Sequence, residues 1–194
     1  MSPEISEIQE KLKTELNSHR YEHTLGVMYT AGCMAMRYGE EVEKALLAGL
    51  LHDCAKCISI EEKLELCKQY QLEMSHAEKN NPELIHAKLG VKIAKDKYHI
   101  EDEDILNAIS SHTTGRPDMS LLEKIIYIAD FMEPGRKNLP NMKDVRRLAF
   151  EDIDKCLFRI LKDSLVYFKS KNFVVDPMTE KTYNYYKETL GMEE

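Results

Sequence analysis

The 194-residue sequence is poor in glycine and proline, has no long apolar run and carries no excess of positive charge. With only 8 glycines and 6 prolines, disorder on a large scale is not expected. The longest apolar run, Ala45 to Leu51, is far too short to cross a bilayer, and the charged N-terminus is unlike a signal peptide. We therefore expect a cytoplasmic protein that does not contact membranes.

The sequence also lacks the features of a disulfide-bonded or nucleic-acid-binding protein. Its five cysteines are an odd number scattered along the chain, and we expect them to be reduced. The net charge of −7 disfavours nucleic-acid binding, which needs a basic face to displace counterions from phosphates. Any phosphate ligand must then be held by local cations or metal ions.

What the sequence does contain is helical periodicity. Apolar residues recur three or four positions apart near both ends, within 5–16 and 153–168. The only candidate strand, Phe173 to Val175, is followed by Asp176 and Pro177 and is better explained as a loop. Further helices are predicted at about 19–38, 41–56, 60–70, 82–97, 102–112, 119–132 and 179–190.

These helices predict an all-α fold, an irregular bundle of about eight or nine helices. A length of 194 residues suits one domain with a sizeable core. We predict a single domain over residues 1–194, with a core at about 18–170 on which the helix at about 179–190 packs.

The most informative residues are charged side chains inside apolar helices, because a buried carboxylate costs several kcal/mol unless it is paired or bound to a metal. Asp130 is the clearest case, since it directly follows the apolar run at 125–129. No Lys or Arg lies on its local face between Lys124 and Arg136. Asp130 must therefore meet a cation from elsewhere in the fold.

His52 and Asp53 are a second such case, at the end of another apolar helical segment. Adjacent helical residues diverge by about 100°, yet both can reach one ion near a helix end, and Asp53 has a second oxygen for a second ion. His23, His86 and His112 lie in three further predicted helices. Imidazoles together with carboxylates suit iron, manganese, cobalt or zinc.

Each of these residues alone has a simpler explanation. A single helical histidine is more often a core or surface residue than a ligand, so His19, His76 and His99 are given no role. Cys54 and Cys57 have the C-x-x-C spacing of redox proteins, but without the accompanying strands packing explains them better. Only the combination of histidines and aspartates in apolar helices favours a metal site.

In the order in which they occur, His23, the His52-Asp53 pair and Asp130 resemble the ligands of the HD-domain superfamily of metal-dependent phosphohydrolases. The added His86 and His112 resemble its two-metal branch. Over about residues 18–170 the chain is similar to the bacterial YqeK family. The stretches that carry this similarity are Arg20-Tyr21-Glu22-His23-Thr24, Leu51-His52-Asp53-Cys54-Ala55-Lys56, Ser111-His112-Thr113-Thr114-Gly115 and Ala129-Asp130-Phe131-Met132-Glu133-Pro134-Gly135-Arg136.

The resemblance implies an HD-type helical bundle and symmetrical hydrolysis of diadenosine tetraphosphate to two ADP molecules. It implies iron as the metal, while the residue types alone also admit manganese, cobalt or zinc. By resemblance, one ion would be held by His23, His52, Asp53 and Asp130, and a second by His86, His112 and a bridging Asp53.

Breaking a phosphoanhydride needs a nucleophile at neutral pH and cations beside the transferring phosphoryl group, and a metal pair supplies both. We assign catalytic roles to Asp53 and to Lys56, which follows it by three positions and is expected on the same helical face. Arg20, Lys56 and Arg136 lie within a few residues of a proposed ligand, which favours phosphate binding over a solvated surface position.

The stretch after His112 is ambiguous. Thr113 is expected to contact phosphate, but a helix C-terminal cap explains the neighbouring Gly115 equally well. Arg116 is as well explained by a surface position as by phosphate binding.

Two other functions stay open at this point. The chain could be another HD-type phosphohydrolase, acting on a nucleoside triphosphate or a cyclic nucleotide, or a non-catalytic regulator that binds a nucleotide. In each case the expected partner is a small nucleotide, such as a dinucleoside polyphosphate or an ADP- or GDP-like product. The metal, the base and the oligomeric state, a homodimer included, are left open.

Overall fold

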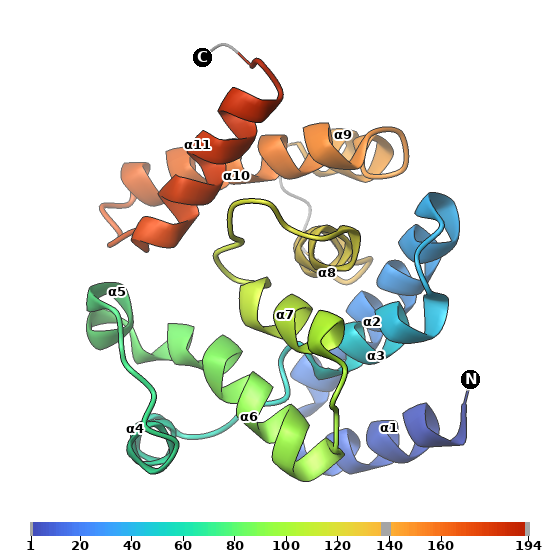
Figure 1. The fold of residues 1–194 in the computed structure, drawn as a ribbon, viewed down its shortest axis with the longest axis vertical. Helices are drawn as coiled ribbons and strands as arrows, with labels where there is room; N and C mark the ends of the chain where they lie inside the picture. The colour runs from blue at the N-terminus through green and yellow to red at the C-terminus, as the bar shows by residue number, and fades with distance from the viewer. Residues whose placement is uncertain (1, 137–140, 193–194) are drawn as a thin grey trace.

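The computed structural model describes residues 2–136 and 141–192, and every regular element within these two ranges is a helix. The all-α prediction is confirmed. The elements, drawn in Figure 1, are α1 (Pro3–Glu15), α2 (Ser18–Tyr38), α3 (Val42–Leu51), α4 (Ile60–Gln69), α5 (His76–Asn80), the 3-10 helix η1 (Pro82–Ile85), α6 (His86–Tyr98), α7 (Glu103–Ser111), α8 (Leu121–Met132), α9 (Met142–Leu148), α10 (Ile153–Ser170) and α11 (Pro177–Thr189).

Helix α8 lies in the middle of the fold, between α2, α3 and α7 on one side and α9 and α10 on the other (Figure 1). It begins at a capping box in which the side chains of Ser120 and Glu123 bond to each other's backbone N–H groups. Ile125, Ile126 and Ile128 are completely buried, and each such burial contributes roughly 1.5–3 kcal/mol. This packing fixes α8 and with it the position of Asp130 in its last turn.

Helices α2 and α3 approach each other closely, and Gly49 makes this possible. A Cβ atom at position 49 would lie only 2.9 Å from the Cα atom of Met28, so any larger residue there would force the two backbones apart. The close approach brings His23 of α2 and His52, at the end of α3, to the same point.

The described part of the chain contains more and shorter helices than predicted, eleven α-helices and one 3-10 helix instead of eight or nine. Helices α5 and α9 were not predicted. The helix expected at 41–56 ends at Leu51, because the N–H groups of Cys54 and Lys56 bond to carbonyls only three residues back, in tight turns. The helix expected at 82–97 is divided at His86 into η1 and α6.

The C-terminal part follows the prediction more closely. Residues 173–175 form a loop, and α11 packs on α10, where the rings of Phe158 and Tyr183 stack with centroids 5.3 Å apart. The prediction of a single domain is compatible with this contact but stays a prediction. Among the described helices, none is both long and apolar enough to cross a membrane.

Candidate metal centre and its cavity

The structure brings together all six residues predicted as metal ligands. They come from five helices: α2 supplies one, α8 supplies one, and the others lie at the ends of α3 and α7 and the start of α6. Apart from Asp130, whose side chain is 20% exposed, they are buried. The six are His23, His52, Asp53, His86, His112 and Asp130.

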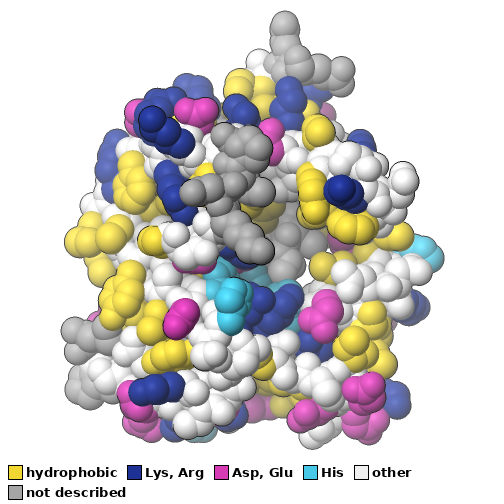
Figure 2. Space-filling model, turned by 180° about the vertical axis from the view of Figure 1, so that it is seen from behind, with side chains coloured by type: hydrophobic (Ala, Val, Ile, Leu, Met, Phe, Trp, Pro, Cys, Tyr) yellow, Lys and Arg dark blue, Asp and Glu magenta, His cyan; other side chains and the backbone are white. Residues whose placement is uncertain are grey.

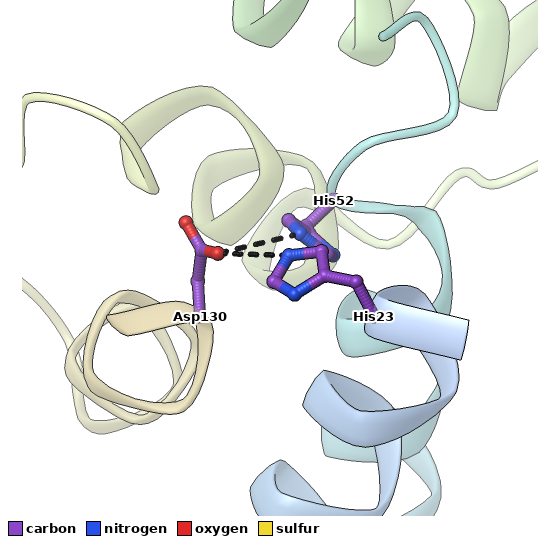
Figure 3. A group of neighbouring side chains, drawn as sticks. All are labelled: His23, His52 and Asp130. Carbon is purple, nitrogen blue, oxygen red and sulfur yellow. Dashed lines mark ion pairs between the residues drawn. The ribbon is translucent and has the colours of Figure 1, made fainter. Parts of the chain in front are cut away.

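One part of the centre is formed around Asp130, as Figure 3 shows. His23 points from α2 and His52 from the end of α3 toward the same carboxylate oxygen. The Nε2 atom of His23 lies 3.0 Å from Asp130 Oδ1, and that of His52 lies 3.9 Å from it.

The other part of the centre is formed around Asp53, whose two oxygens face different histidines. Oδ1 lies 3.1 Å from His86 Nε2 and 3.6 Å from His112 Nε2. Oδ2 lies 3.5 Å from His52 Nε2 and 4.0 Å from His23 Nε2. Asp53 therefore lies between the two groups of histidines, as a bridging carboxylate would.

The second ring nitrogen of three histidines bonds to a backbone carbonyl. The Nδ1 atom of His52 lies 2.7 Å from Gly49 O, and that of His112 lies 2.7 Å from Ile109 O. The Nδ1 atom of His86 is bonded in the same way to the carbonyl three residues earlier, at 2.5 Å. A carbonyl only accepts, so Nδ1 carries the proton and Nε2 presents its lone pair to the centre, the form that binds a metal.

The centre fits a metal ion by two further observations. Among the described residues, the buried Nε2 atoms of His23 and His52 have no hydrogen-bond partner, which is costly unless a ligand satisfies them. There are two sets of three candidate ligand atoms, and within each set all three atoms lie within 4.8 Å of one another. One set comes from His23, His52 and Asp130, and the other from His52, Asp53 and His112. His52 belongs to both sets, whereas the family resemblance placed it with one ion only.

The charges of the centre favour ionised carboxylates. Burial alone would raise the pKa of Asp130, but the rings of His23 and His52 and the charge of Arg136 lower it well below its usual range. Asp53 is likewise opposed by burial but kept ionised by its histidine neighbours, which lower its pKa. Burial lowers the pKa of His86 to about 4, so that its ring is neutral at physiological pH.

Three cations predicted to bind phosphate lie beside the centre. Arg20 Nη1 donates to Asp53 Oδ2 at 2.6 Å, and Arg136 Nη2 donates to Asp130 Oδ1 at 2.6 Å. Lys56 lies in the turns after α3 rather than on a helical face with Asp53, and its Nζ atom is 3.4 Å from the Nδ1 atom of His86. Their predicted contact with phosphate stays a prediction.

The residues that follow His112 have different roles. Thr113 lines the cavity described below. Gly115 has a φ of +63° and donates its N–H to the carbonyl of Ser111, so it acts as the helix cap that the sequence allowed. Arg116 forms two 2.6 Å hydrogen bonds to Glu123, in the capping box of α8, and its role is structural.

The two cysteines of the C-x-x-C spacing lie in different environments. Cys54 is buried and its thiol donates to the carbonyl of Gly90, whereas Cys57 is exposed. Both are free cysteines. Packing therefore explains Cys54 but not Cys57.

A cavity of about 1020 Å³ opens beside the centre. In Figure 2, histidine and basic side chains lie together near the middle of one face, with acidic side chains on either side. The far wall of the cavity comes from α9 and α10. Its lining residues are His19, Arg20, Glu22, His23, Gly26, His112, Thr113, Tyr127, Asp130, Phe131, Glu133, Pro134, Gly135, Arg136, Asn141, Met142, Asp163, Ser164, Tyr167 and Phe168.

No role was predicted for Glu133 or for three aromatic residues of the cavity, Phe131, Tyr167 and Phe168. Glu133 is buried, and its Oε1 atom lies 3.0 Å from Nδ1 of His23. Its position in the Glu133-Pro134-Gly135-Arg136 stretch was the only signal for it. For Tyr167 and Phe168 the signal was helical spacing on α10, and for Phe131 it was the apolar segment of α8. Core packing explains both patterns equally well.

Comparison with known proteins identifies the family. The model of the HD domain matches residues 20–135, a range that includes all six candidate ligands. This chain belongs to the HD domain family. The HD domain implies a divalent metal ion, and the histidine and aspartate groups described above could bind one.

Several relatives of this HD domain protein match it along nearly its whole length. The symmetrical bis(5'-nucleosyl)-tetraphosphatase of Bacillus subtilis is 42% identical, covering 90% of this chain and 92% of the relative. The protein of the same name from Staphylococcus aureus is 34% identical, covering 94% of each. A Clostridium acetobutylicum crystal structure, described as a predicted HD superfamily hydrolase involved in NAD metabolism, is 41% identical with a TM-score of 0.91, covering 95% of this chain and 97% of that one.

Proposed function

We propose that this HD domain protein hydrolyses diadenosine tetraphosphate symmetrically and releases two molecules of ADP. The observation that carries the proposal is the convergence of four histidine Nε2 atoms on Asp53 and Asp130 beside a cavity of about 1020 Å³. The relatives from Bacillus subtilis and Staphylococcus aureus are named for this reaction and align with almost the whole chain.

The proposed centre holds two metal ions, and we propose that they are iron. His23, His52, Asp53 and Asp130 would hold one ion, and His86, His112 and Asp53 the other. When bound, such a pair lowers the pKa of a bound water and offsets the negative charge of the phosphoryl oxygens. Nitrogen and carboxylate ligands also accept manganese, cobalt or zinc.

In this proposal the two arginines bind phosphate, because bound metal ions would release them from the ligand carboxylates. Arg20 and Arg136 each neutralise a ligand carboxylate, and their side chains are 23% and 41% exposed. When a metal ion neutralises that carboxylate, the guanidinium can turn into the cavity and form paired hydrogen bonds to phosphate oxygens. Lys56 and Thr113 would contact the phosphate chain from the sides of His86 and His112.

The far wall of the cavity suits a nucleoside. Tyr167 and Phe168 of α10, together with Phe131 at the end of α8, offer aromatic faces on which a purine can stack. Asn141 and Asp163, which hydrogen-bond to each other, bring polar atoms to the same wall. With its polyphosphate over the metal centre, a dinucleotide would thus place one nucleoside against the aromatic residues of α10.

Product analysis tests the proposal. Purified protein is incubated with diadenosine tetraphosphate and one defined metal at a time, and the nucleotides are separated by chromatography. ADP as the only product is expected, whereas ATP and AMP in equal amounts would overturn symmetrical cleavage. His112→Ala is the matched control, because it removes a proposed ligand and should abolish ADP release.

A substrate panel extends the same experiment. Faster turnover of a nucleoside triphosphate or a cyclic nucleotide would replace the proposed substrate. Tight nucleotide binding without turnover, after iron has been restored, would identify a regulator instead of an enzyme.

A further inference from the structure

The four histidines of the centre are held in two different ways. His52, His86 and His112 each follow the end of a short helix, namely α3, η1 and α7. Carbonyl oxygens in the last turn of a helix have no helical N–H partner. Each of these three rings therefore finds a free carbonyl three residues earlier for its Nδ1 proton.

His23 has no such carbonyl, because it lies inside a long helix. α2 continues to Tyr38, so the carbonyl oxygens before His23 already accept the N–H groups of the helix. Its Nδ1 atom pairs instead with the Oε1 atom of Glu133, at 3.0 Å. Among the described histidines of the centre, His23 is thus the one whose Nδ1 atom is supported by a carboxylate.

The Glu133 carboxylate is held firmly. Its side chain is only 4% exposed, and its Oε2 atom accepts the N–H of Gly135 at 2.5 Å. It passes directly over Gly26, where a Cβ atom would lie 2.4 Å from Oε2. Arg146 donates to the backbone carbonyls of Met132 and Glu133, which fixes the end of α8.

The negative charge of the centre is consequently unequal on its two sides. Beside His23 lie the carboxylates of Asp130 and Glu133, together with one oxygen of Asp53. Beside His86 lies the other oxygen of Asp53, and the ammonium of Lys56, 3.4 Å from the ring, is 4.0 Å from the carboxylate of Glu83. Arg20 and Arg136 offset the charges of Asp53 Oδ2 and Asp130 on the first side. Glu133 has no Lys or Arg partner among the described residues, so its carboxylate is the charge that makes the first side more attractive to a cation.

We propose that Glu133 is a positioning residue that holds His23 in its ligand form and makes the His23–Asp130 position the tighter of two metal positions. The proposal rests on the two-metal centre of the proposed function, but not on its substrate. Carboxylates behind a histidine ligand raise its basicity and fix its ring, and their loss weakens metal binding about 10- to 100-fold.

Glu133→Gln is the discriminating variant. Glutamine has one oxygen, and if that oxygen keeps the bond to the N–H of Gly135, its NH₂ group faces His23. The ring must then accept at Nδ1 and carry its proton at Nε2, where it can no longer bind a metal. Gly26→Ala is the second variant, since it displaces the carboxylate without removing its charge and replaces a helical glycine by a better helix former.

The measurement is a titration of metal-free protein with Co²⁺ in the absence of nucleotide. Binding is detected by calorimetry and by the visible absorption of bound Co²⁺. The wild type should bind two equivalents in two steps. Glu133→Gln and Gly26→Ala should weaken the tighter step about 10- to 100-fold and leave the weaker step unchanged. His86→Ala should remove the weaker step alone.

Glu123→Gln is the matched control, because Glu123 is also a buried, hydrogen-bonded carboxylate but belongs to the capping box of α8. It should leave both steps unchanged. The proposal is overturned if Glu133→Gln and Gly26→Ala weaken both steps equally or neither, if His86→Ala removes the tighter step, or if the wild type binds in one step. If the titration behaves as expected but ADP is not the product, the substrate assignment fails and the role of Glu133 stands.

Discussion

The metal centre, which we call the floor of the cavity, and the far wall from α9 and α10 are built in opposite ways. On the floor, five of the six candidate ligands are at most 6% exposed, and three of the histidine rings are hydrogen-bonded to backbone carbonyls. The far wall carries half-buried and exposed side chains, of which Tyr167 is 53% exposed. Burial and these hydrogen bonds hold the floor in place before any ligand arrives, as the chemical step requires, whereas the exposed side chains of the wall can adapt to a bound base.

The largest expected effect follows from removing a charge from the floor. Asp130→Asn keeps the shape of the side chain but leaves His23 and His52 without their shared carboxylate. We expect turnover to fall by about 10³-fold or more, at least the effect of losing one donor of an oxyanion hole. Turnover and metal content per chain are the measurements. A variant with unchanged metal content and turnover would show that the floor is a structural cluster and not a metal centre.

A smaller effect is expected where floor and wall meet, at Arg136. Arg136→Ala removes a proposed phosphate contact and should lower kcat/KM by about 10²-fold. Arg136→Lys restores the charge but not the paired hydrogen bonds, so it should recover only part of the loss. The metal content should stay at the wild-type value, and a loss of metal would place Arg136 with the floor instead.

On the wall the expected effect is smaller again and confined to binding. Stacking on an aromatic side chain contributes about 1–3 kcal/mol per base, and the exposure of Tyr167 suggests the lower end, or roughly a fivefold change. Tyr167→Ala should therefore raise KM about fivefold and leave kcat unchanged. Tyr29→Ala is the matched control, because Tyr29 is equally exposed but does not line the cavity. Equal KM values for the two variants would contradict a nucleoside at this wall.

The smallest effect is expected at Cys57, which belongs to neither region. Cys57→Ser should change the free energy of unfolding by less than about 0.5 kcal/mol, as is usual for exposed positions. Turnover should be the same with and without a thiol reductant. A dependence on reductant that disappears in Cys57→Ser would revive the redox interpretation of the C-x-x-C spacing.

The floor was largely predictable because its residues violate the local pattern of their helices. Asp130 after five apolar positions and His52-Asp53 at the end of another apolar segment each require a partner that the local sequence does not supply. That requirement is visible in one sequence. The family resemblance then added His86 and His112 to the same centre, where the structure places them.

Other features were not predictable because they depend on contacts between distant residues. Glu133 lies 110 positions from His23, and Gly26 leaves the space for its carboxylate, a relation that no helical periodicity contains. Helix α3 ends at Leu51, as the tight turns after it and the bond from His52 to the Gly49 carbonyl show. Apolar spacing alone cannot distinguish these turns from one more turn of helix.

The carbonyl supports of the three helix-end histidines have a consequence for mutational tolerance. A backbone carbonyl survives replacement of its own side chain, so a point mutation at Glu83 or Ile109 leaves the support of His86 or His112 in place. The support of His23 resides in a side chain and is lost in one substitution. Among related sequences, the orientation of His23 should therefore vary most. The other three histidines should keep their orientation even where the side chains around them change.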